Sequence, residues 1–148
     1  MAVDIILDVI KQRKPNLVEM GTKGASGVKE VLMGSNTAKV IDKASHPVIA
    51  VPEKASFDGI KKIVYATNYH SSDIIALKQL TDIAKVFKSW INVIHISAGE
   101  YTLESEEEYL QKFAKKVKQE INYKYISYQL LHASEIEKSL NNTLKRSP

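Results

Sequence analysis

The stretch MGTKGASGVKEVLMGSN, residues 20–36, contains four of the six glycines in this 148-residue chain. It follows an apolar segment, residues 17–20, that is typical of a strand, and it leads into a segment, residues 35–45, with the apolar spacing of a helix. Glycine loses more conformational freedom on folding than any other residue. A cluster of glycines between two elements therefore indicates either a tight turn or a backbone that a ligand approaches closely. The four residues are Gly21, Gly24, Gly27 and Gly34.

Strand-like and helix-like segments alternate outward from this stretch. Short connections between alternating strands and helices predict a parallel sheet with helices on its faces. The sequence therefore predicts an α/β protein with an open five-stranded parallel sheet and helices on both faces. Helices are expected over residues 2–15, 35–45, 71–89, 105–121 and 134–148, and strands over residues 17–20, 46–52, 60–68, 90–97 and 124–132. The helix over residues 71–89 is expected to open at Ser72.

The composition limits the classes of function. The chain has no cysteine, which excludes disulfides and thiolate metal sites and fits a reducing, cytoplasmic location. No apolar run approaches the roughly 18 residues of a membrane span, and the first residues lack the pattern of a signal peptide. The formal net charge of +4 comes from interspersed rather than segregated charges. This balance tolerates an anionic ligand, and it makes nucleic acid an unlikely partner.

The glycine stretch has the setting of a phosphate site. Ligands of open parallel sheets bind beyond the carboxyl ends of the strands, and a helix N-terminus offers free N–H groups to an anion. Ser35, Asn36 and Thr37 would supply polar groups there, and Lys23 and Lys29 would add positive charge. The P-loop pattern and the G-x-G-x-x-G pattern are both absent from the sequence.

The pattern that is present, Gly21-x2-Gly24-x9-Gly34-Ser35, resembles the nucleotide-binding signature of the universal stress protein family, G-x2-G-x9-G-(S/T). The flanking segments NLVEMGTKG and LMGSNTAKVIDKASHPVIAVP resemble that family too. In the second half of the chain, IKKIVYATNYHSSDIIAL resembles the beginning of such a domain and INVIHISAG its second strand. The resemblance covers nearly the whole chain, in permuted order.

This order implies the central part of a tandem two-domain member. Residues 1–52 would be the C-terminal half of one domain, residues 53–60 a linker, and residues 61–148 the N-terminal half of the next. A weak similarity of residues 2–15 to residues 135–148 agrees with this arrangement. The resemblance implies a sheet order of 3-2-1-4-5, assembled from the permuted halves within one chain or between the chains of a homodimer with exchanged halves.

The resemblance also implies a site for an adenine nucleotide, ATP or ADP, with or without magnesium. The acidic residue of the family's first-strand "TD" pair is replaced here by Asn68, which keeps an acceptor oxygen and loses the charge. Backbone at Ile96, after His95, would meet the adenine. The resemblance maps the phosphate contacts to Gly21, Gly24, Gly34, Ser35 and Asn36, and the nucleoside contacts to Thr67, Asn68 and Ile96. Met20 and Ala66 complete the set of implied binding residues.

Two functions remain open at this point. The first is a nucleotide-binding module of the stress response, with at most slow ATP hydrolysis, because neither a catalytic residue nor a metal-binding residue can be assigned. The alternative is a member without nucleotide that acts through dimerisation or partner binding. A nucleic-acid binder is a weaker third. His95 is expected in the core or at its rim, and Glu104–Glu108 as the solvated start of a helix.

Overall fold

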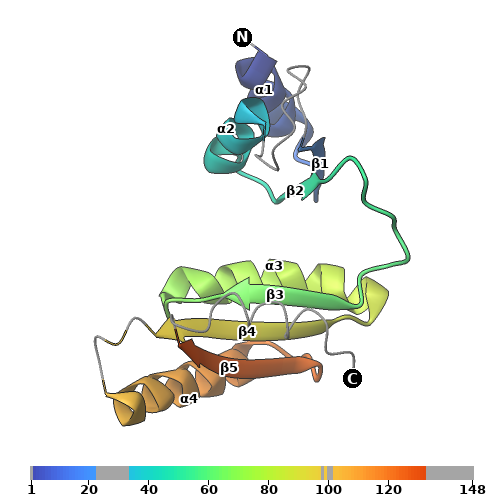
Figure 1. The fold of residues 1–148 in the computed structure, drawn as a ribbon. Coiled ribbons are helices and arrows are strands. Elements are labelled where there is room, and N and C mark those ends of the chain that lie inside the picture. The colour runs from blue at the N-terminus through green and yellow to red at the C-terminus, as the bar shows by residue number, and fades with distance from the viewer. Residues whose placement is uncertain (1, 23–33, 98, 100–101, 133–148) are drawn as a thin grey trace. The chain divides into compact units, whose positions relative to one another are not determined.

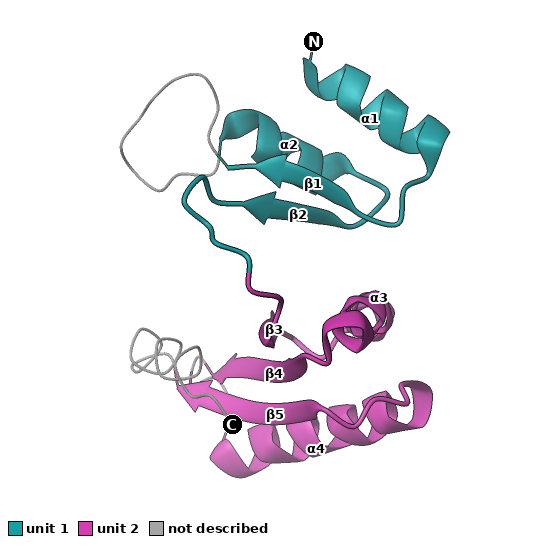
Figure 2. Ribbon diagram, turned by 90° about the vertical axis from the view of Figure 1, so that its right-hand side faces the viewer, with its two compact units in different colours: residues 1–57 teal, residues 58–148 magenta. Residues whose placement is uncertain are grey.

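Two parallel sheets form the framework of the protein. The computed structural model describes residues 2–22, 34–97, 99 and 102–132. The chain divides into two compact units, residues 1–57 (unit 1) and residues 58–148 (unit 2), which are coloured separately in Figure 2. The boundary falls in the segment between the second and third strands (Figure 1). Each unit therefore has its own sheet and its own core.

Unit 1 is a two-stranded parallel sheet with both helices packed on one face. Its elements are α1 (Ala2–Arg13), β1 (Val18–Gly21), α2 (Ser35–Lys43) and β2 (Val48–Val51). The strands pair in register from Val18 opposite Val48 to Gly21 opposite Val51. The alternate strand residues Val18, Met20 and Val48 pack against buried Val3, Ile10 and Val40 of the two helices. Alternation along the strands thus leaves Glu19 and Ile49 exposed on the other face.

Unit 2 is a three-stranded parallel sheet in the order β3-β4-β5. Its elements are β3 (Lys62–Ala66), α3 (Ser71–Phe87), β4 (Trp90–Ser97), α4 (Leu103–Glu120) and β5 (Ile126–His132). Buried residues recur at helical spacing along α3 and α4, and they pack with Ile91 and Val93 of the central strand. The core is formed by Ile74, Leu77, Ala84, Ile91, Val93, Phe113, Val117 and Ile121.

The structure confirms the mixed α/β class with parallel sheets, and it contains the strands and helices expected within the described residues. The expected helix over residues 134–148 lies outside them. The strands form one sheet of two and one sheet of three, so the order of five strands in a single sheet stays a prediction. The expected opening of α3 at Ser72 is wrong, because the helix begins at Ser71 and the backbone N–H of the preceding His70 bonds to the carboxylate of Asp73.

No helix in the described part of the chain is long and apolar enough to cross a membrane.

Candidate functional site

Both described ends of the glycine stretch lie at the carboxyl ends of β1 and β2. The backbone N–H of Thr22 donates to the carbonyl of Val51 at 3.0 Å, which extends the pairing one residue beyond the strands. The N–H of Gly34 then donates to the carbonyl of Thr22 at 2.7 Å. These two bonds hold both ends of the loop together, so α2 begins beside the end of the sheet. Gly24, Gly27, Lys23 and Lys29 lie outside the described residues.

The first turn of α2 is tied to β1 by a buried threonine. The hydroxyl of Thr37, which is 4% exposed, donates to the carbonyl of Gly21 at 2.8 Å. Gly34 occupies the N-cap position, and no side chain among the described residues caps the helix. The side chains of Ser35 and Asn36 are exposed beside this end. The arrangement presents the N–H groups and the positive end of the helix dipole to solvent, which suits an anion.

The backbone geometry of Gly21 and Gly34 does not require glycine. Neither residue has a positive φ, and Gly34 has φ −51° and ψ 138°, a conformation open to most residues. A Cβ added to Gly21 would meet no atom within 4 Å. Neither position therefore needs glycine for its backbone conformation, and Gly21 does not need it for packing. Open space over Gly21 is what the approach of a ligand to the backbone would need.

In unit 2, a hydrogen-bonded hub lies at the carboxyl end of β3. Thr67 is buried, and its N–H donates to the carbonyl of Ile94 on β4 at 2.9 Å. Its hydroxyl donates to the carboxylate of Asp73 at 2.6 Å and accepts from the N–H of Tyr69 at 2.9 Å. The hydroxyl of Tyr65 also donates to Asp73, at 3.1 Å. Burial, followed by the charge of Asp73, raises the pKa of Tyr65 to about 12.

The carboxylate of Asp73 therefore accepts hydrogen bonds from within unit 2. It accepts from the two hydroxyls of Tyr65 and Thr67 and from the N–H of His70 at 3.1 Å. The sequence places Asp73 in the first turn of a helix, but it does not reveal this role, because two of the three partners lie on the preceding strand and its end. Asn68, in contrast, is exposed at the position where the resemblance expects an acid.

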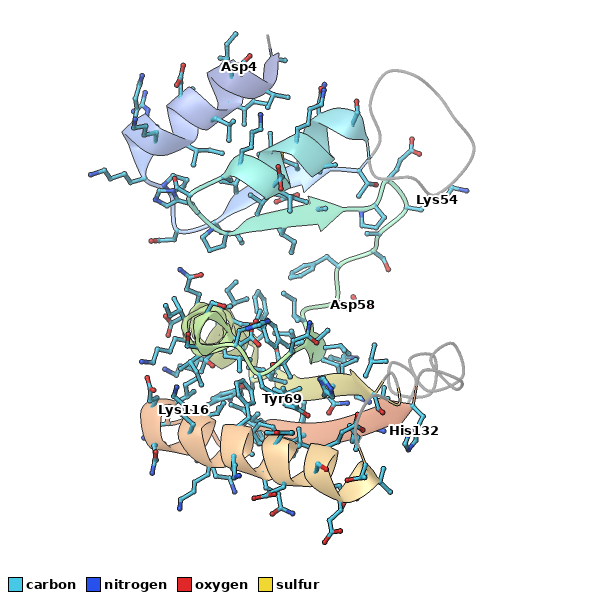
Figure 3. The ribbon with its side chains drawn as sticks, turned by 90° about the vertical axis from the view of Figure 1, so that its left-hand side faces the viewer. Asp4, Lys54, Asp58, Tyr69, Lys116 and His132 are labelled. Carbon is cyan, nitrogen blue, oxygen red and sulfur yellow. The ribbon has the colours of Figure 1, made fainter. Side chains whose placement is uncertain are left out.

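His95 joins the same hub from β4. Its Nδ1–H donates to the carbonyl of Thr67 at 2.8 Å, and its ring stacks on Tyr69 with centroids 4.4 Å apart. Tyr69, labelled in Figure 3, has φ 63°, and its ring also packs against Phe113 of α4 at 5.5 Å. His95 is half-buried, in agreement with the expectation of a residue at the rim of the core.

One acidic residue of α4 is buried rather than solvated. Glu106 is only 4% exposed, and its carboxylate accepts from the hydroxyl of Ser97, at the end of β4, at 2.9 Å. The expectation of a fully solvated helix start is therefore wrong at this residue. Helical periodicity turns Glu106 toward the sheet, where Ser97 offers a partner that the local sequence does not show.

The predicted site residues fall into two groups, one in each unit. Within unit 1 the structure brings Met20 and Gly21 next to the start of α2. Within unit 2 the end of β3 bonds to Ile94 and His95 of β4, and Ile96 is the next residue along that strand. No group of three or more histidine and acidic residues suited to a metal ion occurs among the described residues. The unit 1 group is Met20, Gly21, Gly34, Ser35 and Asn36, and the unit 2 group is Ala66, Thr67, Asn68 and Ile96; Gly24 lies outside the described residues.

Comparison with known proteins agrees with the sequence pattern over the first part of the chain. Residues 1–52 match the family model described as the universal stress protein family. No curated protein matches the chain. The matched segment spans α1, β1, the glycine stretch, α2 and β2, and so contains all of the unit 1 site group. Over residues 1–52, this chain is thus similar to the universal stress protein family.

Proposed function

We propose that this protein binds ATP or ADP, with the phosphates over Gly21 and at the start of α2. The observation that supports it most directly is the open space over Gly21 beside a helix start that no described side chain caps. Exposed Ser35 and Asn36 would add side-chain donors to the backbone N–H groups. The family match of residues 1–52 fits the same function.

The nucleoside would lie at the carboxyl ends of β3 and β4, near Asn68 and the backbone of Ile96. This placement requires unit 1 and unit 2 to share one site, from the same chain or from two chains. Open strand edges support such joining. Within the described residues, β1 pairs only with β2, and β3 pairs only with β4. We propose that β1 pairs with β3, which would complete a five-stranded sheet, and that the two strands come from different chains of a homodimer.

A second candidate function is partner binding without nucleotide. The observation that favours it is Asn68, which is exposed and carries no charge to fix a ribose. In this case the glycine stretch would be retained only as part of the fold, and dimerisation would carry the function.

The substitution Gly21→Val separates the two functions. Valine suits the end of a strand, and its side chain enters space where even the Cβ meets nothing within 4 Å, so folding should be unaffected. The same side chain would block an approaching phosphate. We expect the affinity for ATP, measured by calorimetry, to fall by about tenfold or more, which corresponds to about 1.4 kcal/mol.

Ser45→Thr is the matched control, because it enlarges an exposed residue beyond the other end of α2 and keeps the hydroxyl. It should bind ATP like the unmodified protein. The unmodified protein should also melt at a higher temperature with ATP, since ligand at a hundredfold excess over Kd stabilises the folded state by about 2.7 kcal/mol. Equal ATP affinity in Gly21→Val and the unmodified protein would contradict the phosphate site. No measurable ATP binding to the unmodified protein would favour the second function.

A further inference from the structure

Lysines gather at one end of unit 2. Strands β3, β4 and β5 are parallel, so their amino ends lie together (Figure 1). The carboxyl ends of α3 and α4 lead into β4 and β5 through short connections, and so they lie at the same end. The fold thereby brings together five lysines that are spread over residues 61–124. This lysine end is formed by Lys61, Lys62, Lys88, Lys118 and Lys124.

The helix dipole accounts for only part of this arrangement. Lys118 lies in the last turn of α4 and Lys88 is the C-cap of α3, positions where positive charge is favourable in any helix. The other three lysines lie at the start of β3 or just before β3 and β5. Within the described residues, none of the five forms an ion pair. Two acids are close to them in sequence, Asp58 and Glu120, and Glu120 is paired with Lys78 at 2.7 Å. The lysine end therefore has an excess of positive charge.

Aromatic rings lie among these lysines. The ring centroid of Trp90, at the start of β4, is 5.3 Å from that of Tyr125, which is 5.7 Å from that of Tyr123. The ammonium group of Lys124 lies over the Tyr125 ring, 4.7 Å from its centroid. The hydroxyl of Tyr123 donates to the carbonyl of Ser89 at 2.6 Å, which anchors these three rings, the aromatic row, to the end of α3. Trp90 keeps 36% of its surface exposed.

Backbone contacts hold the lysines beside the aromatic row. The N–H of Trp90 donates to the carbonyl of Lys61 at 3.0 Å, and Lys62 is the partner of Trp90 in the β3–β4 register. On the other side, Lys118 and Lys124 line the same cavity of about 350 Å³. An anionic chain that crossed the aromatic row would therefore meet lysines on both sides of it.

We propose that the lysine end and the aromatic row bind single-stranded nucleic acid. Phosphates would lie against the lysines and unpaired bases would stack on Trp90 and Tyr125, a combination that binds single strands without sequence preference. The exposed Lys124 would exchange its contact with the Tyr125 ring for a phosphate. Interspersed charges along the sequence argue against nucleic acid, but the fold gathers the lysines at one end. This surface lies at the amino ends of the strands, opposite the nucleotide site, and it does not depend on that site.

The single tryptophan of the chain reports the stacking directly. We expect an oligothymidylate of about ten nucleotides to bind the full chain and to quench the fluorescence of Trp90. If about three phosphates are contacted, raising the salt from about 50 to about 200 mM should weaken binding about 20-fold. An abasic strand has the same phosphates without bases, and a duplex has its bases already stacked, so both should bind more weakly and leave the Trp90 fluorescence unchanged.

A double charge variant tests the lysine end. Lys61→Gln combined with Lys124→Gln removes two exposed charges, and it should bind a labelled oligothymidylate about tenfold more weakly in fluorescence anisotropy. Lys11→Gln combined with Lys39→Gln is the matched control. It removes two exposed lysines of unit 1, so the net charge changes equally, and it should bind like the unmodified protein.

Tyr125→Ala tests the stacking and should weaken binding about tenfold. Tyr109→Ala is its control, because Tyr109 of α4 is 49% exposed and also has a lysine, Lys112, over its ring at 6.0 Å. Equal losses in the two double charge variants, an abasic strand or a duplex bound as tightly as the oligothymidylate, or no binding to the unmodified chain would overturn the inference. Gly21→Val should bind the oligothymidylate normally, so failure of the ATP site and failure of this surface are distinguishable.

Discussion

The purified chain is expected to be a dimer with twice the 16.6 kDa mass of one chain. Within its described residues, unit 1 supplies two paired strands, and an isolated two-stranded sheet is marginally stable in water. Exposed strand edges also tend to pair with other chains. Pairing of β1 from one chain with β3 of another removes both open edges, and a second, identical pairing closes the dimer with two-fold symmetry.

The same pairing within one chain is possible, but it would hold the connection nearly taut. Ile60 and Lys61 already bond to residues at the start of β4, so the free connection after Val51 is Pro52–Gly59. A turn shortens it, because the N–H of Ala55 donates to the carbonyl of Pro52 at 2.9 Å. The connection then reaches at most ~28 Å. It would have to span ~20 Å along the strands and ~10 Å across two strand spacings, or ~22 Å directly, before any detour around side chains.

Light scattering on a variant with a longer connection tests whether the length of the connection decides between dimer and monomer. We expect insertion of about ten Gly/Ser residues between Asp58 and Gly59, enough to add ~17 Å of mean reach, to shift the dimer toward monomer. The control carries the same residues after Pro148 and should stay dimeric. A monomer at all concentrations for the unmodified chain would exclude the exchange. A dimer that the insertion leaves unchanged would indicate association through another surface.

Replacement of Asp73 by alanine is expected to have the largest effect on the stability of unit 2. Its carboxylate accepts three hydrogen bonds, from Tyr65, Thr67 and the backbone of His70, and it helps to cap α3. Alanine would leave the buried Thr67 hydroxyl and the half-buried Tyr65 hydroxyl without this acceptor. We expect a loss of about 2–4 kcal/mol in the free energy of unfolding, measured by urea denaturation.

Asp82→Ala is the matched control on the same helix. The Asp82 side chain is 78% exposed and pairs with Lys85 at 3.5 Å, so its removal should cost less than about 1 kcal/mol. Thr67→Val removes the hydroxyl that donates to Asp73, and so tests the same hydrogen bond from its other partner. In the double variant the losses should not add, because Asp73 and Thr67 contact each other directly. Equal effects of Asp73→Ala and Asp82→Ala would show that the hub contributes little to stability.

The sequence by itself determined the elements of this protein and the place of its glycine stretch. Residues 71–89 show why: apolar residues at helical spacing and polar residues at the start give a helix that the structure places at Ser71–Phe87. Such signals lie within a few residues of each other along the chain, so they can be read locally. The same holds for residues 1–52, where the spacing of the glycines agrees with the family match.

Only the tertiary structure decided which partners these polar and aromatic side chains contact. Glu106 lies in an acidic segment typical of a solvated surface, and it is buried because α4 turns it toward Ser97 of β4. Tyr69 lies in a short connection, and it stacks on His95, which is 26 positions further along the chain (95 − 69). Asp73 accepts a bond from Tyr65 because the end of β3 returns beside the first turn of α3. These partners come together only when strands pair and helices pack on them, so no local pattern in the sequence could specify them.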